Sequence, residues 1–243
     1  MIATTRDSIS LRGAGVVTIA QPKTGFRFTL DSLLLADFCR IKPRDRILEL
    51  GAGTGVISLL IAKKFPKTHL VADEAEVAAY RLLRQNIETN GLGDRIVPDD
   101  RDIKNLGRGF APNTFDVIVA NPPYTRCGTG RRSPSVERQM ARQDQCASVN
   151  SWLDRQDLLK NRGRYMLVFP AGRMAELIAL LRERDLEPKR IRFVHPYLTK
   201  PASLLLIEAV KGAGTSLEVL PPLIVHEKGG GYTAEMREIY GMK

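Results

Sequence analysis

The chain has 243 residues, 43% of them hydrophobic, and a formal net charge of +10. This length suits one large α/β domain, no apolar run reaches membrane-spanning length, and residues 1–10 lack the apolar stretch of a signal peptide. The cysteines Cys39, Cys127 and Cys146 are scattered and fit no zinc pattern, so we expect reduced thiols, no metal site and a soluble cytoplasmic protein. The excess of positive charge favours a polyanionic partner.

Apolar periodicity and turn residues predict strands that alternate with helices. Residues 1–28 are mixed, 125–150 are rich in Arg and Gly and predict a long loop, and the Gly- and Pro-rich tail after 211 predicts a loose extension. Asp31 or Ser32 is expected to cap the first helix. In chain order the predicted elements are a helix over 33–41, a strand over 46–53, a helix over 56–65, a strand over 68–73, a helix over 76–90, a weak strand over 94–99, a strand over 115–124, a helix over 151–160, a strand over 163–170, a helix over 174–185 and two strands over 189–197 and 202–210.

This alternation predicts a mostly parallel sheet covered by helices on both faces, the Rossmann-like α/β class. Such sheets bind ligands beyond the carboxyl ends of their strands. The predicted division is an N-terminal segment with a helix over the ligand site (1–45), a catalytic domain with the loop 125–150 (46–211), and a C-terminal extension (212–243). Pro98 restricts the weak third strand to an edge of the sheet.

A glycine-rich turn follows the first predicted strand. Its glycines allow a close backbone approach, and the next helix offers amides to an anion. The spacing fails the nicotinamide fingerprint, because Val56 stands where a third glycine is needed. Glu49 could hold an ammonium group, so the amino and carboxylate groups of S-adenosylmethionine fit this turn. The residues expected to bind this cofactor here are Glu49, Gly51, Ala52, Gly53 and Gly55.

Acidic residues follow the next two strands. Glu74, preferred to Asp73, can accept both ribose hydroxyls. After the third strand, the Asp102 carboxylate could accept the adenine amino group while Ile103 covers a ring face, although Asp99 and Asp100 compete for this role.

The sequence Asn121-Pro122-Pro123-Tyr124 closes the fourth predicted strand. An aromatic amine is a poor nucleophile, because its lone pair is delocalised into the ring. The Asn121 oxygen and the Pro122 carbonyl, held by the stiff proline backbone, could accept both amine hydrogens and direct the lone pair at a methyl donor. Tyr124 could stack on the base, which must leave its helix, so a single-stranded or loop substrate is favoured.

These motifs together resemble class I methyltransferases that act on the N6 of adenine or on glutamine amides. The segments GFRFTLDSLLLA (25–36), GTGRRSPSVERQMAR (128–142), FVHP (193–196) and LPPLIV (220–225) are similar to the bacterial tRNA1(Val) adenine-37 N6-methyltransferase family, over roughly residues 10–235. The resemblance implies a seven-stranded sheet with an antiparallel last strand, and a segment at Asp31 that folds over the cofactor. It implies methylation beside the anticodon of a tRNA. The chain departs from the family at Gln143-Asp144, where related sequences have His-Glu.

The arginines after Asn-Pro-Pro-Tyr border the predicted acceptor pocket. Arg126, Arg131, Arg132 and Arg138 are expected to bind RNA phosphates. Two alternatives are a protein glutamine N5-methyltransferase of the release-factor type and a non-catalytic RNA-binding module of the same fold. Release-factor methyltransferases usually carry a separate helical N-terminal domain, and residues 1–45 are few for such a domain. The intact motifs argue against the non-catalytic module. We expect a monomer or weak homodimer.

Overall fold

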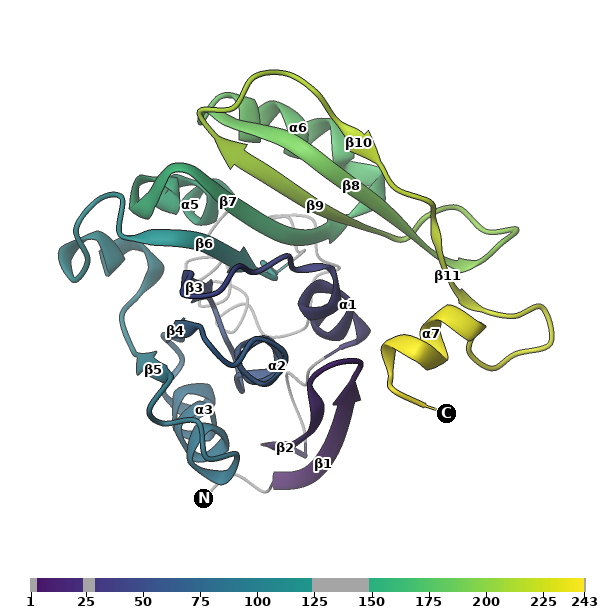
Figure 1. The fold of residues 1–243 in the computed structure, drawn as a ribbon, viewed down its shortest axis with the longest axis horizontal. Coiled ribbons are helices and arrows are strands. Elements are labelled where there is room, and N and C mark those ends of the chain that lie inside the picture. Colours follow the sequence, from purple (N-terminus) through teal and green to yellow (C-terminus); the bar gives the residue numbers. More distant parts are fainter. Residues whose placement is uncertain (1–3, 24–28, 124–148, 243) are drawn as a thin grey trace, which may run out of the picture.

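The computed structural model describes residues 4–23, 29–123 and 149–242. Within these ranges nine strands form one sheet, in the order β10-β8-β9-β7-β6-β3-β4-β5, with β11 also paired to β8 (Figure 1). The strands are β3 (Arg46–Leu50), β4 (His69–Asp73), β5 (Ile96–Asp99), β6 (Phe115–Ala120), β7 (Leu159–Pro170), β8 (Leu186–Tyr197), β9 (Leu204–Lys211), β10 (Glu218–Val219) and β11 (Leu223–His226).

Helices cover both faces of this sheet. Successive side chains of a strand point to opposite faces, so each central strand contributes to two buried clusters. In β6, Val117 and Val119 join one buried cluster, whereas Ile118 and Ala120 join the other. The first cluster includes residues of α1 (Leu30–Phe38), α2 (Val56–Lys64) and α3 (Val77–Thr89). The second includes residues of η1 (Ile103–Arg108), α5 (Val149–Leu153), η2 (Asp154–Leu158) and α6 (Met174–Arg182), with η3 (Ala171–Arg173) packed beside it. The predicted α/β class is therefore confirmed.

Six of the seven central strands run in the same direction, and the last in chain order, β9, is antiparallel to both β7 and β8, as predicted. Pro98 lies in β5, which among the described strands pairs with β4 alone and forms an edge of the sheet, as predicted. The sheet is wider than the expected seven strands, because β10 and β11 add to β8 in parallel.

Two predicted helices differ from the structure. The helix α1 begins at Leu30, so its N-cap is Thr29 and the prediction of Asp31 or Ser32 was wrong. The predicted helix over 151–160 was also wrong in its second half. There α5 ends at Leu153, a 3-10 turn follows, and residue 159 already begins β7.

A hairpin that the sequence did not predict precedes α1. Its strands, β1 (Thr4–Leu11) and β2 (Gly15–Pro22), pair antiparallel. The side-chain amides of Asn86 in α3 and of Asn90, the C-cap of α3, form hydrogen bonds with the backbone of β2. Asn86 exchanges hydrogen bonds with the backbone of Ala20 at 2.7 and 3.0 Å, and Asn90 does so with Thr18 at 3.0 and 2.8 Å. Asn86 also donates to the Thr54 carbonyl at 2.8 Å, so the hairpin is tied to the glycine-rich turn.

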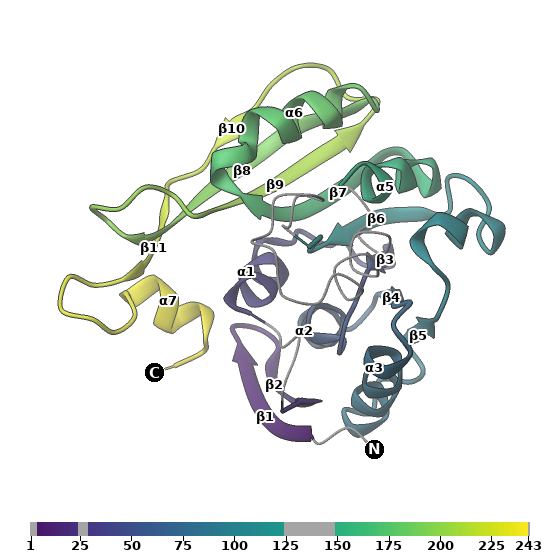
Figure 2. The ribbon, with the colours of Figure 1, turned by 180° about the vertical axis from the view of Figure 1, so that it is seen from behind.

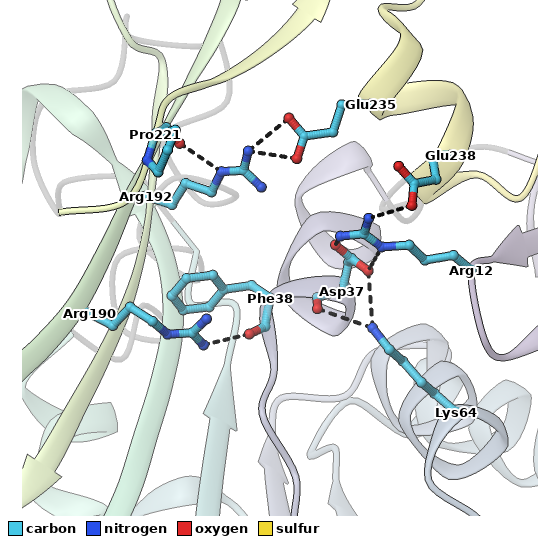
Figure 3. A network of polar contacts seen from close by, with 9 residues as sticks. All are labelled: Arg12, Asp37, Phe38, Lys64, Arg190, Arg192, Pro221, Glu235 and Glu238. Atoms are coloured by element: carbon cyan, nitrogen blue, oxygen red, sulfur yellow. Dashed lines mark hydrogen bonds and ion pairs between the residues drawn. The ribbon is translucent and has the colours of Figure 1, made fainter. Parts of the chain in front are cut away.

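The tail is folded, so the prediction of a loose extension was wrong. Its helix α7 (Ala234–Ile239) lies beside β11 and α1 in both views (Figures 1 and 2). Met236 and Ile239 are buried in the first cluster, which supplies the apolar contact that a loose tail would lack. Arg192 of β8 donates to both oxygens of Glu235 at 2.7 and 2.8 Å, and Arg12 pairs with Glu238 at 3.4 Å (Figure 3).

Candidate active site

The carboxyl ends of β3, β4, β5 and β6 meet at one edge of the sheet, since these four strands are adjacent and parallel. The glycine-rich turn follows β3, Glu74 follows β4 and Asn121 follows β6. Asp102 lies just beyond the end of β5. The structure thus brings the residues predicted from four separate stretches of sequence to one edge.

The glycine-rich turn is fastened to the end of β4. Gly51, Gly53 and Gly55 have positive φ values of 59°, 58° and 88°, a conformation that side chains with a Cβ avoid. The Ala52 amide donates to the Asp73 carbonyl at 2.6 Å, and the Gly53 amide donates to the Glu74 carboxylate at 2.7 Å. The turn is therefore already shaped by protein contacts.

Glu49 caps helix α2 from the strand that precedes the turn. Its Oε2 accepts a hydrogen bond from the Ser58 amide at 2.9 Å and another from the Ser58 hydroxyl. Burial raises the pKa of Glu49 to about 8, although both Ser58 contacts favour the ionised form. Ser58 is thus the partner that the structure shows for Glu49, and a contact with an ammonium group stays a prediction.

Two neighbouring acids end β4. Glu74 accepts hydrogen bonds from the amides of Gly53 and Glu76 at 2.7 and 2.8 Å, and burial raises its pKa. Asp73 is only 2% exposed, and its Oδ1 has no hydrogen-bond partner among the described residues. Burial, followed by repulsion from Asp99, raises the pKa of Asp73 to about 8. Asp73, which sequence reasoning ranked below Glu74, is therefore the acid with an unused acceptor.

Of the two residues predicted to bind adenine, Asp102 is exposed and Ile103 is buried. Asp102 is exposed and accepts from the Lys104 amide at 2.8 Å, so it caps η1. Ile103 is buried in the second apolar cluster, which also contains Trp152. Of the competing acids, Asp99 is buried and pairs with Arg101 at 3.3 Å, whereas Asp100 is exposed.

Trp152 supports the glycine-rich turn and was not identified from the sequence. A Cβ added to Gly51 would lie 2.3 Å from Cη2 of the Trp152 indole, so the ring lies directly against this glycine. The buried Tyr165 hydroxyl holds Trp152 by donating to its backbone carbonyl at 2.8 Å. Neighbouring sequence offered no signal for this contact, because residues 52–151 separate the two side chains.

Asn121 is held by the first helix. Its Nδ2 donates to the Ser32 hydroxyl at 3.3 Å, and Ser32 is buried in α1. This contact orients the amide nitrogen towards α1. Asp31 precedes Ser32, so the segment expected to fold over the cofactor does lie beside Asn121. Ser32 is a second residue that sequence reasoning missed in this role.

Pro122 is buried and Pro123 is exposed. The remaining predicted residues lie outside the described part of the chain: Tyr124, Arg126, Arg131, Arg132, Arg138, Gln143 and Asp144.

The residues at this edge fit an S-adenosylmethionine molecule. The unpartnered Asp73 Oδ1 and the Glu74 carboxylate offer acceptors for hydroxyl or amine hydrogens, beside a turn whose glycines admit a close approach. Within residues 4–23, 29–123 and 149–242, no group of three His, Cys, Asp or Glu side chains could hold a metal ion. No helix in these ranges is long and apolar enough to cross a membrane.

Comparison with known proteins places these features in a family. Residues 27–145 match the methyltransferase small domain. A tRNA1(Val) (adenine(37)-N6)-methyltransferase of Porphyromonas gingivalis is 30% identical over 194 residues, covering 77% of this chain and 75% of that protein. One from Vibrio campbellii is 28% identical over 223 residues, 90% of each chain.

Among solved structures, a predicted O-methyltransferase from Agrobacterium tumefaciens superposes with a TM-score of 0.71 at 21% identity. The match covers 87% of this chain and 96% of that one, and supports the class I methyltransferase fold. From its sequence similarity over most of its length, the chain belongs to the tRNA1(Val) (adenine(37)-N6)-methyltransferase family.

Proposed function

We propose that this protein transfers a methyl group from S-adenosylmethionine to the N6 of an adenine in tRNA. The names of its relatives point to adenine 37 of tRNA1(Val). The observation that supports this proposal most directly is the placement of Asn121, whose amide is held by Ser32 at the same sheet edge as the glycine-rich turn.

The acceptor amine is activated by position. The hydrogen bond from Asn121 Nδ2 to Ser32 orients the amide group, and we assign the amide oxygen to accept a hydrogen of the substrate amine. The Pro122 carbonyl accepts the second hydrogen from a backbone that proline stiffens. Two acceptors draw the amine nitrogen towards a tetrahedral shape and expose its lone pair, so positioning replaces a strong base. Tyr124 covers one face of the base.

The cofactor site is assigned to the residues at the ends of β3, β4 and β5. When bound, S-adenosylmethionine supplies an electrophilic methyl group on a sulfonium. Glu74 accepts the ribose hydroxyls, Asp73 takes a further hydrogen on its unused Oδ1, and Asp102 with Ile103 holds the adenine. Glu49 accepts from the Ser58 amide at the start of α2, and we assign it to the ammonium group of the methionine end. Asp31 covers the methionine end, with Gly51, Ala52, Gly53 and Gly55 beneath it.

The tRNA is proposed to bind across the same edge. The net charge of +10 favours a polyanion, and Arg126, Arg131, Arg132 and Arg138 are proposed to contact its phosphates near the target base. In this proposal residues 46–211 form the catalytic domain, 1–45 cover the cofactor, and the extension 212–243 completes the sheet, in a cytoplasmic monomer or weak homodimer. The release-factor alternative is not favoured, because the relatives are named tRNA methyltransferases.

A labelled-methyl assay tests this proposal. The protein is incubated with isotopically labelled S-adenosylmethionine and one of three acceptors: a tRNA1(Val) transcript, the same transcript with guanine at position 37, or a release factor. We expect labelled N6-methyladenosine in the first transcript only, identified by mass spectrometry of its nucleosides. Label on release-factor glutamine, or no label on any adenine, would overturn the proposal.

A further inference from the structure

Four aromatic rings lie in a row where the C-terminal extension meets the end of β8. Tyr197 ends β8, His226 ends β11, Tyr232 follows the next turn and Tyr240 is the C-cap of α7. The ring centroids are 5.3 Å apart for Tyr197 and His226, 5.3 Å for His226 and Tyr232, and 5.0 Å for Tyr232 and Tyr240. We call these four side chains the aromatic row.

The backbone fixes the spacing of these rings. His226 is in register with Tyr197 across the parallel β11–β8 pair, and it forms an antiparallel bridge with Tyr232. The Tyr232 hydroxyl donates to that of Tyr240 at 3.4 Å. Because backbone pairing places Tyr197, His226 and Tyr232 side by side, these three rings are held in position and lose little conformational freedom when a ligand stacks on them.

The row lies at the edge of the sheet that carries Asn121. The strands β6, β7 and β8 run in the same direction, so Tyr197 ends its strand on the side where Asn121 follows β6. The turn between β8 and β9 is fastened to the end of β7, since the Ala171 amide donates to the Ser203 carbonyl at 3.1 Å. Three strand spacings, about 14 Å, separate β6 from β8 across the sheet. Tyr197 also lies five residues, about 17 Å, beyond the level of Asn121 along the strands, so the two residues are on the order of 20 Å apart. RNA bound at Asn121 can therefore reach the row.

The outer end of the row is open and flanked by positive charge. Tyr197 is 38% exposed, and the adjoining Leu198 is 78% exposed. Lys200 and Lys228 are exposed on the two turns that border the row, and the exposed Glu227 beside Lys228 is paired with Arg237 at 3.4 Å. An apolar, aromatic end beside two ammonium groups complements a nucleotide, whose base has a π-face and whose phosphate is an anion.

We propose that the aromatic row is a second RNA-binding site, on which an unpaired base of the tRNA stacks against Tyr197 while the adenine to be methylated lies at Asn121. This inference rests on the proposed function and adds to it a contact outside the methyl-transfer site. The two sites together would recognise a loop, because a base at each site requires unpaired nucleotides.

Direct RNA binding tests the row without relying on methylation. Fluorescence anisotropy measures the Kd of a labelled anticodon stem–loop RNA for the full-length protein. The double variant Tyr197→Ala/Leu198→Ser should weaken binding by about tenfold or more, the usual effect of losing one stacked base. Tyr197→Phe keeps the ring and should bind as the wild type does. The Kd for S-adenosylmethionine should be unchanged in both.

A control variant removes exposed apolar side chains that lie near the opposite end of β8 from Tyr197. Leu217 and Val219 are 43% and 60% exposed, beside the amino-terminal half of β8. Leu217→Ser/Val219→Ser should leave RNA binding unchanged. Stem–loops with one 2-aminopurine in the loop provide a second readout, because stacking on Tyr197 quenches its fluorescence, and the quenching should vanish at one loop position in Tyr197→Ala.

Unchanged RNA affinity in the Tyr197→Ala/Leu198→Ser variant would overturn the proposal, as would an equal loss in the Leu217→Ser/Val219→Ser control or in Tyr197→Phe. These outcomes are distinct from failure of the proposed function. A protein that methylates adenine 37 but does not need Tyr197 refutes the aromatic row alone. A protein that binds the stem–loop through Tyr197 but leaves its adenine unmethylated refutes only the assignment of the reaction.

Discussion

The contact between Gly51 and Trp152 predicts how the cofactor turn responds to one added methyl group. In Gly51→Ala the new Cβ would lie 2.3 Å from the indole, at a residue whose φ is +59°. The positive φ costs about 1–2 kcal/mol, and crowding in a packed interior adds about 1–3 kcal/mol. We therefore expect the free energy of unfolding to fall by about 2–5 kcal/mol and the affinity for S-adenosylmethionine to fall with it.

Gly91 provides the matched control. Its φ is +65°, but no atom lies within 4 Å of an added Cβ. Gly91→Ala should therefore cost only the conformational part, about 1–2 kcal/mol, and leave cofactor binding unchanged. Thermal unfolding measures the loss of stability in both glycine variants, because each kcal/mol shifts Tm by about 2–4 °C in a domain of this size.

A double-mutant cycle isolates the crowding. In a Trp152→Leu background, where the indole is absent, Gly51→Ala should cost no more than Gly91→Ala. Equal costs of the two glycine variants in the wild-type background would refute the proposal that Trp152 supports the turn.

Three further predictions concern the site, the buried acids and the tail. Ser32→Ala removes the hydrogen bond that orients Asn121, so kcat should fall about fivefold with no change in the Kd for S-adenosylmethionine; a wild-type kcat would contradict this positioning role. The raised pKa of Asp73 favours its neutral form in the folded state, so its stabilising contribution is complete below about pH 4 and is lost as pH rises through about 8. Asp73→Asn should flatten this decline in Tm, and an unaltered pH profile would argue against burial as its cause. Met236 is fully buried and Met242 is 52% exposed, so in urea denaturation Met236→Ala should cost about 2–5 kcal/mol and Met242→Ala almost nothing; two small, equal losses would show that the tail is not part of the core.

The sequence predicted the central sheet because its signals are local. Strands such as Arg46–Leu50 and Phe115–Ala120 are short apolar runs bounded by turn residues. Pro98 marked an edge strand, because proline cannot donate to a second neighbour. Glu74 and Asn121 could be placed at one edge from strand direction alone, since parallel strands end together.

The features that were missed depend on partners far away in the chain. The strand Thr4–Leu11 is largely polar, and its hairpin is fixed by the amides of Asn86 and Asn90 on a later helix. The tail is rich in glycine and proline, and only its contacts with β8 and the first apolar cluster order it. Trp152 lies against Gly51, and Ser32 against Asn121, by tertiary packing that no local pattern encodes.

The central claim is that Asn121 activates an adenine amine, and a single-turnover experiment tests it most directly. Protein saturated with S-adenosylmethionine is mixed with tRNA1(Val), and the rate constant for N6-methyladenosine formation is measured for the wild type and for Asn121→Ala, with the cofactor Kd measured in parallel. We predict a fall of about 10²–10³-fold in this rate constant at unchanged cofactor Kd. A rate constant within a few-fold of the wild-type value would contradict the claim.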